Sequence, residues 1–196
     1  NLADQLKYAT KHGIEHHHLN GKTLGMSFQK SSTRTRVSFE TGMYQLGGQA
    51  LFLSNRDLQI GRGEPVEDTA RVLSRYLDGI MIRTFEQKEV EDLAKYGSIP
   101  IIKGLTDYCH PCQVLADLMT IREYKKSFDG LKFCFIGDGN NMANSLIVGA
   151  ITMGMSCAIA CPDEYNPDAE IMKWAEENGN FICSINILEC AKNEDI

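Results

Sequence analysis

The stretch Ser32-Thr33-Arg34-Thr35-Arg36 decides how the rest of this sequence is interpreted. It follows an apolar segment and precedes a segment in which Phe39, Met43 and Leu46 recur at helical spacing. Ser32 is a favourable N-cap residue, so the pentad is expected at a helix N-terminus, where free backbone N–H groups attract anions. Arginine adds a planar group that grips phosphate through two parallel hydrogen bonds. The pentad therefore predicts a phosphate site, with a capped surface helix carrying solvated arginines as the alternative.

The composition is that of an ordinary globular protein. The chain has 196 residues, of which 43% are apolar and 23% charged, enough for one complete domain and part of a second. A net charge of −6 argues against a nucleic-acid partner, and no apolar run is long enough to span a membrane. The seven cysteines are scattered through apolar segments. We therefore expect reduced thiols and a cytoplasmic protein.

Strand-like and helix-like segments alternate along the chain. The expected strands cover residues 22–28, 49–54, 79–84, 99–103, 131–136, 156–161 and 181–185. The expected helices cover residues 1–11, 65–77, 88–96, 142–153 and 167–177, besides the two that begin near Ser32 and His110. This order predicts an α/β fold with two parallel-sheet αβα (Rossmann-like) domains, the second incomplete. The polar segment 125–130 is the expected hinge between domains 1–125 and 126–196.

Basic and polar side chains follow three of the expected strands. The pentad follows the first strand, Arg83 ends the third, and the segment 106–113 follows the fourth. Because ligands bind at the carboxyl ends of parallel strands, we expect these groups on one edge of the sheet. The proline after His110 suits the first turn of a helix, which places His110 and Gln113 near the start of that helix.

Three motifs have other interpretations. His16-His17-His18 suggests a metal site, but three consecutive side chains cannot share one face, so we expect a solvated loop. Cys109-His110-Pro111-Cys112 matches the CxxC of thioredoxin-like oxidoreductases, which would leave the arginines unexplained. Gly137-Asp138-Gly139 matches the start of a dinucleotide fingerprint with Asp163 as ribose ligand, but Met142 stands where the third glycine belongs. A nicotinamide-dependent oxidoreductase is the alternative from another class, and a non-catalytic anion-binding module is a third.

Three motifs in this order resemble the aspartate/ornithine transcarbamylase family. The pentad resembles its carbamoyl-phosphate motif and His110-Pro111-Cys112-Gln113 its second motif, while Gly137-Asp138-Gly139-Asn140-Asn141-Met142 resembles the substrate-domain turn of the ornithine branch. The resemblance implies a transferase that moves the carbamoyl group of carbamoyl phosphate to the δ-amine of L-ornithine, giving L-citrulline and phosphate. Another amine, such as putrescine, is the variant. The family also implies no cofactor, no metal, and a homo-oligomer built from trimers.

The resemblance assigns roles to individual residues. It implies that eight residues contact carbamoyl phosphate: Ser32, Thr33, Arg34, Thr35, Gln59, Arg83, His110 and Gln113. Arg83 and His110 would also act as catalytic residues by polarising the carbonyl oxygen. Gln59, in the polar loop 57–64, would reach the active site of a neighbouring subunit. Asn141 would bind ornithine.

Two later motifs of the family, resembling Asp-x-x-x-Ser-Met-Gly and His-Cys-Leu-Pro, do not occur in this sequence. In the family they hold the amino acid and the reacting amine. We therefore expect the chain to be a fragment that lacks the start and the C-terminal part, and that turns over little or no ornithine by itself.

Overall fold

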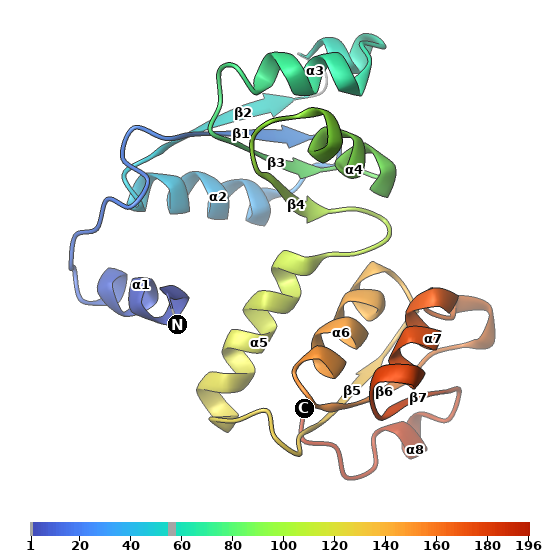
Figure 1. Ribbon diagram of the computed structural model, residues 1–196. Helices are drawn as coiled ribbons and strands as arrows, with labels where there is room; N and C mark the ends of the chain where they lie inside the picture. The colour runs from blue at the N-terminus through green and yellow to red at the C-terminus, as the bar shows by residue number, and fades with distance from the viewer. Residues whose placement is uncertain (1, 55–57) are drawn as a thin grey trace. The chain divides into compact units, whose positions relative to one another are not determined.

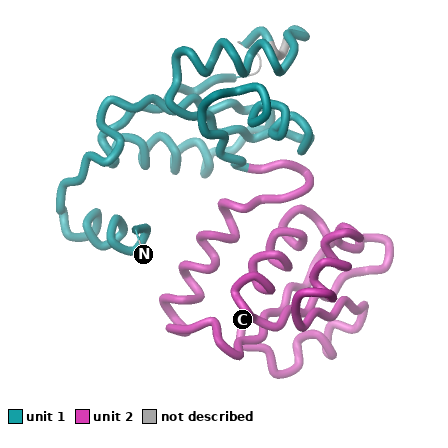
Figure 2. The backbone as a smooth tube through the Cα atoms, in the orientation of Figure 1, with its two compact units in different colours: residues 1–104 teal, residues 105–196 magenta. Residues whose placement is uncertain are grey.

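The computed structural model describes residues 2–54 and 58–196. It divides into two compact units, residues 1–104 and 105–196 (Figure 2). Each unit is a parallel sheet with helices packed on it, as the order of strands and helices predicts (Figure 1). Helix α5 (Pro111–Lys125) belongs to the second unit because Val114 and Ile121 lie in its core. The expected domain boundary at residues 125 and 126 lies at the other end of this helix.

The first unit contains a sheet with the strand order β2-β1-β3-β4. The strands are β1 (Thr23–Phe28), β2 (Gln49–Ser54), β3 (Gly79–Arg83) and β4 (Ile101–Leu105), and the helices are α1 (Leu2–Lys11), α2 (Thr33–Gln45), α3 (Val66–Leu73) and α4 (Gln87–Tyr96). Strand β1 pairs in parallel with β2 and β3, and Phe28 at its end lies opposite both Ser54 and Arg83. The three carboxyl ends are therefore level at one edge of the sheet.

Helices cover both faces of the first sheet. Met26 and Met81 point toward α2, where they pack with Met43, whereas Ile82 points to the opposite face and packs with Ala70 of α3 and helix α4. Figure 1 shows α2 and α3 on opposite sides of these strands. The alternation of buried residues along β3 thus sets the three-layer arrangement, because successive side chains of a strand point to opposite faces.

The segment between β2 and β3 differs in part from the expectation. Helix α3 spans Val66–Leu73, so Pro65 is its N-cap residue and not the first residue of the helix, and the helix ends before Leu77. The Ser74 hydroxyl donates to the Ala70 carbonyl oxygen over 2.7 Å and satisfies a carbonyl of the last turn. In the expected loop 57–64, Gln59–Arg62 form a short 3-10 helix, η1, while residue 57 lies outside the described residues.

The second unit contains a parallel sheet with the order β5-β6-β7. Its strands are β5 (Lys132–Ile136), β6 (Ser156–Ala160) and β7 (Phe181–Ser184), and its helices besides α5 are α6 (Asn141–Thr152), α7 (Ala169–Asn178), the four-residue α8 (Ile187–Cys190) and the 3-10 helix η2 (Asp163–Tyr165). Helices α5, α6 and α7 share one core with Phe133, Cys157 and Ile159. Cys190 of α8 packs on the other face, so that face carries much less helical cover. The sequence did not predict α8 or η2.

Candidate functional site

The pentad forms the start of α2, and Ser32 is its N-cap residue, as predicted. The Ser32 side chain accepts a hydrogen bond from the Thr35 backbone N–H over 3.2 Å and donates to the Thr35 hydroxyl over 3.0 Å. Thr33 and Arg34 are exposed in this first turn, which contains no acidic residue. The turn therefore presents hydroxyl, guanidinium and backbone donors with no carboxylate among its own residues, which suits an anion.

The second arginine of the pentad is engaged by the protein itself. The Arg36 Nε donates to the Glu40 carboxylate over 3.0 Å, and its guanidinium lies 3.8 Å from the centre of the Phe52 ring. Both contacts engage the Arg36 guanidinium, which belongs to the predicted phosphate-binding pentad. Arg34 is therefore the better anion ligand of the two.

Arg83 ends β3 beside this helix start. Its Nη1 lies 3.5 Å from the Thr35 hydroxyl, and its backbone carbonyl accepts a hydrogen bond from the Gln29 N–H over 2.9 Å. The Arg83 Nε is buried and makes no hydrogen bond to a described residue. Burial lowers the pKa of the Arg83 guanidinium, because desolvation disfavours its charged form. A phosphate bound here would supply both the missing acceptor and the missing countercharge.

In the second unit, the start of α6 holds His110 in place. His110 is the N-cap residue of α5, and its backbone N–H donates to the Ser145 hydroxyl over 2.7 Å. The same hydroxyl donates to the Asn141 carbonyl oxygen over 2.6 Å, and Ser145 is 7% exposed, so water does not compete for these bonds. The two residues predicted to contact different substrates, His110 and Asn141, are thus joined through one buried serine.

Two asparagines of α6 fix the segment that precedes His110. The Asn141 amide donates to the Thr106 carbonyl over 2.8 Å, and the Asn144 amide donates to the Tyr108 carbonyl over 2.9 Å. The Asn144 oxygen accepts from the Asp168 N–H over 2.9 Å. The amide N–H of Asn141 therefore supports the protein, which leaves its side-chain oxygen to face a ligand. Sequence reasoning missed Asn144 and Ser145; their signal is two polar residues inside an otherwise apolar helix.

Both predicted glutamines are exposed. Gln113 is exposed in the first turn of α5, and its amide donates to Asp117 over 2.9 Å. Gln59 is exposed in η1. The structure thus brings Ser32, Thr35 and Arg83 together in the first unit, and it joins His110 to Asn141 in the second.

The structure also bears on the two oxidoreductase interpretations. Burial raises the pKa of the Cys112 thiol, so this thiol is not an activated nucleophile. A Cβ on Gly139 would lie 2.2 Å from the Pro167 nitrogen and 2.4 Å from the Tyr165 carbonyl oxygen. Gly139 is therefore required for contact with the protein's own chain, which accounts for this glycine without a dinucleotide.

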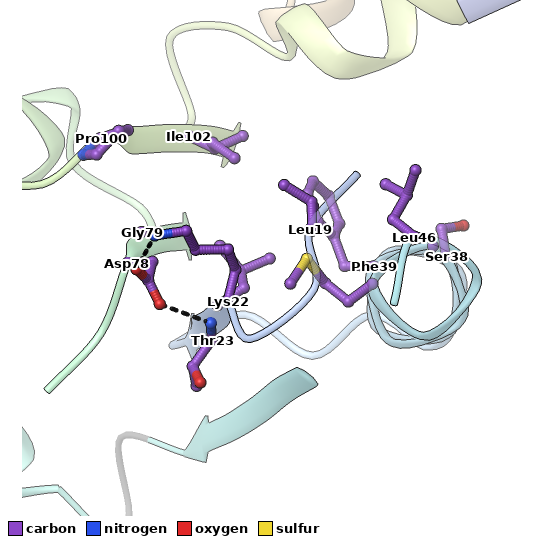
Figure 3. A pocket seen from close by; sticks show the side chains of 13 residues that line it. Leu19, Lys22, Thr23, Ser38, Phe39, Leu46, Asp78, Gly79, Pro100 and Ile102 are labelled. Carbon is purple, nitrogen blue, oxygen red and sulfur yellow. Dashed lines mark hydrogen bonds and ion pairs between the residues drawn. The ribbon is translucent and has the colours of Figure 1, made fainter. Parts of the chain in front are cut away.

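The largest cavity described in the first unit lies at the opposite end of the sheet. It measures about 650 Å³ and is lined by Leu19, Phe39 and Met43, among other apolar side chains (Figure 3). Its charged pair is already satisfied, because the Asp78 carboxylate accepts from the Lys22 ammonium over 2.8 Å and from a backbone N–H over 2.9 Å. A smaller pocket of about 400 Å³, which includes Ser32 in its lining, opens at the carboxyl ends of β1 and β2. Its lining is polar and also includes the hydroxyls of Ser31 and Thr33 and the guanidinium of Arg36, which Glu40 and Phe52 engage.

Two negative findings concern the described part of the chain. Within residues 2–54 and 58–196, no helix is long and apolar enough to cross a membrane. The same residues contain no group of three or more His, Cys, Asp and Glu side chains arranged to hold a metal ion.

The chain thus has two α/β units, one with a basic, serine-capped helix start and the other with a Gly-Asp-Gly-Asn-Asn turn. The chain belongs to the aspartate/ornithine carbamoyltransferase family. The family's carbamoyl-P binding domain matches residues 1–123, and its Asp/Orn binding domain matches residues 129–196. The resemblance seen in the sequence is confirmed.

Within the family, the similar proteins carry one name. An ornithine carbamoyltransferase of Pelobacter propionicus is 60% identical over 176 residues, which cover 90% of this chain and 58% of the relative. That of Syntrophotalea carbinolica is 57% identical over 196 residues, or 100% of this chain and 65% of the relative. The structure of ornithine carbamoyltransferase from Pyrococcus furiosus superimposes with a TM-score of 0.95 at 50% identity and covers 98% of this chain and 63% of that one. The chain thus spans about three fifths of the length of these relatives.

Proposed function

We propose that this chain provides the carbamoyl-phosphate site, and part of the amino-acid site, of an enzyme that transfers a carbamoyl group to L-ornithine. The products are L-citrulline and phosphate. The observation that carries the proposal is Arg83, whose buried Nε makes no hydrogen bond to a described residue and whose Nη1 faces Thr35 at the capped start of α2. The names of the similar relatives support ornithine as the acceptor.

In the first unit, the start of α2 binds the phosphate group of carbamoyl phosphate. The hydroxyls of Ser32, Thr33 and Thr35 and the guanidinium of Arg34 donate to the phosphate oxygens, together with backbone N–H groups. Arg83 donates to the phosphate and to the carbonyl oxygen. Phosphate is then a good leaving group, because its charge is already matched before the bond to carbon breaks.

In the second unit, His110 and Gln113 are the proposed ligands of the carbamoyl group, His110 as a donor to a carbonyl oxygen and Gln113 as an acceptor from an N–H₂ group. The neutral δ-amine of ornithine attacks the carbonyl carbon, the C–O bond to phosphate breaks, and the departing phosphate can take the amine proton. Negative charge grows on the carbonyl oxygen during the attack, and each fixed donor aimed at it is worth about 3 kcal/mol in comparable sites. Asn141 offers its side-chain oxygen to the ornithine backbone ammonium.

The amine must be unprotonated to attack. A rate that falls at low pH is therefore expected, because protonation removes the nucleophile.

A binding experiment tests the first half of the proposal on this chain. Carbamoyl phosphate and inorganic phosphate are titrated by calorimetry into the unmodified protein and into Arg34→Ala. We expect Arg34→Ala to weaken binding by about tenfold or more, since a charge-assisted hydrogen bond contributes about 1.5–3 kcal/mol. Arg71→Ala is the matched control, because Arg71 pairs with Asp68 on exposed α3. Equal affinity of Arg34→Ala and the unmodified chain would contradict the site.

The oligomer and the compartment belong to the same proposal. Gln59 of one subunit would serve the site of its neighbour in a trimer, so a mixture of two inactive variants of the complete enzyme, Gln59→Ala and Arg83→Ala, should regain activity through hybrid sites. Absence of recovered activity would contradict a shared site. Cys134, Cys157, Cys161, Cys183 and Cys190 are free thiols, which supports the cytoplasm as the place of the reaction.

A further inference from the structure

One carboxylate joins the two loops that carry the anion site. Glu89 lies in the first turn of α4, and its Oε1 accepts a hydrogen bond from the Gln29 side-chain amide. Its Oε2 accepts from the Thr84 hydroxyl over 2.5 Å, and Thr84 is fully buried. A carboxylate accepts hydrogen bonds and cannot donate them when ionised, so it suits two donors that converge from different loops.

Both donors are close neighbours of the site in sequence. Thr84 follows Arg83 directly, and Gln29 lies in the turn that leads from β1 to Ser32. The backbone of the same turn is hydrogen-bonded to the end of β3, because the Gln29 N–H donates to the Arg83 carbonyl over 2.9 Å. The Lys30 N–H also donates to this carbonyl, over 3.4 Å, so Glu89 adds a side-chain contact to two backbone bonds.

We propose that Glu89 is a positioning residue that holds the Arg83 guanidinium against the first turn of α2. Glu89 acts through Gln29 and Thr84 and does not touch the phosphate. The inference rests on the proposed function, because it assigns a task to the geometry of that anion site. Nothing in the sequence motifs points to Glu89, which lies outside all three.

Charge and position make opposite predictions for this residue. A carboxylate near an anion site repels the anion, so its charge alone predicts tighter phosphate binding when Glu89 is removed. Positioning predicts weaker binding, because the buried Thr84 hydroxyl loses its acceptor and the turn before Ser32 loses its side-chain bond to α4. The sign of the change in affinity therefore separates the two explanations.

The test compares Glu89→Ala, Glu89→Gln and Glu91→Ala by titration with inorganic phosphate. We expect Glu89→Ala to weaken binding by about tenfold, which corresponds to about 1.4 kcal/mol. Glu89→Gln should stay within about twofold of the unmodified protein, since the Gln side chain keeps an acceptor oxygen and the Gln29 amide can turn over to accept from its N–H₂. Glu91→Ala is the control, because Glu91 is exposed on the same helix and only accepts from Gln87 over 3.0 Å.

Hydrogen exchange of the Gln29 backbone amide provides a readout that does not depend on the ligand. Faster exchange in Glu89→Ala together with weaker phosphate binding supports the proposal. Unchanged exchange, or phosphate binding that is equal or tighter in Glu89→Ala, overturns it. Arg34→Ala separates this failure from that of the proposed function: if Arg34→Ala also binds phosphate normally, the anion site itself is wrong, whereas a loss confined to Arg34→Ala removes only the role of Glu89.

Discussion

The two units use the same local topology for different purposes. In each, the first strand of the sheet leads through a polar turn into a helix whose N-cap is a side chain, Ser32 for α2 and Asn140 for α6. The first turn of α2 is exposed and basic, whereas Ala143 and Asn144 near the start of α6 are buried. One helix start is therefore open to a ligand, and the other is occupied largely by the protein.

The partners of the polar side chains explain this difference. At α6, the side chains of Asn141, Asn144 and Ser145 bind backbone groups of the segment 106–110. At α2, Ser32 and Thr35 bind each other, which leaves Arg34 and Arg83 to face an anion. The topology supplies a helix N-terminus in both units, and the contacts of the first turn decide whether its polar side chains stay exposed or hold the segment that carries His110.

The largest effect is expected where a turn has no room for a side chain. In Gly139→Ala, the new Cβ would lie 2.2 Å from the Pro167 nitrogen and 2.3 Å from the Asn166 carbonyl carbon, so backbone must move. We expect a loss of about 3 kcal/mol or more in the free energy of unfolding of the second unit, measured by chemical denaturation. Gly42→Ala in α2 is the control, since a Cβ there meets nothing within 4 Å. Gly42→Ala should stabilise the protein by about 0.5–1 kcal/mol. If Gly139→Ala is as stable as the unmodified protein, the turn before α6 has as much room for a side chain as the turn before α2.

The next largest effect is expected for Arg83. Arg83→Ala removes a charged donor and should weaken phosphate binding by about 10- to 100-fold, measured by calorimetry. Arg83→Lys should not restore it, because an ammonium cannot reproduce the two parallel bonds of a guanidinium. Arg75→Ala, in the exposed turn after α3, serves as the control. Full phosphate affinity in Arg83→Lys would mean that the site needs a positive charge but not the planar geometry of a guanidinium. Charge alone would then distinguish the start of α2 from that of α6.

The sequence could predict those features that depend on local spacing. The alternation of apolar segments predicts all seven strands and their parallel arrangement, and Ser32 predicts the start of α2 to within one residue. The short elements η2 and α8 were missed because three or four residues carry too little periodicity to be recognised.

The sequence could not predict which polar groups the protein uses for itself. Ser145 binds a backbone group 35 residues earlier, and Gln29 binds Glu89 at a separation of 60 residues. The spacing of residues within one segment carries no signal for contacts between such distant positions. For the same reason the sequence places Arg36 in the basic pentad but does not show that Phe52, from another strand, lies against its guanidinium. The motifs predict which residues face a ligand, and the structure was needed to find the residues that hold them.

A smaller effect is expected for the serine that fixes His110. Ser145→Ala removes the acceptor of the His110 N–H and a donor to Asn141, and we expect a loss of about 1–2 kcal/mol in the free energy of unfolding. The chemical shifts of the His110 ring should change in NMR spectra, because its backbone is no longer fixed. Ser127→Ala is the control, since Ser127 is exposed and accepts only from the Asp129 N–H. Unchanged His110 resonances in Ser145→Ala would show that α6 does not hold this residue.

The smallest effect is expected for the two N-cap residues, which are the most similar feature of the two helix starts. The Ser32 hydroxyl accepts from the N–H of Thr35, and the Asn140 side chain accepts from the N–H of Met142. Replacement of either by Ala should lower the free energy of unfolding by about 1 kcal/mol, measured by thermal denaturation, because each leaves one N–H of the first turn without its cap. Only Ser32→Ala should also weaken phosphate binding, since its hydroxyl lies beside Thr35 and lines the polar pocket. Equal losses of phosphate affinity in both variants would mean that binding follows the stability of the protein and not the exposed donors of α2, and the distinction between the two turns would fail.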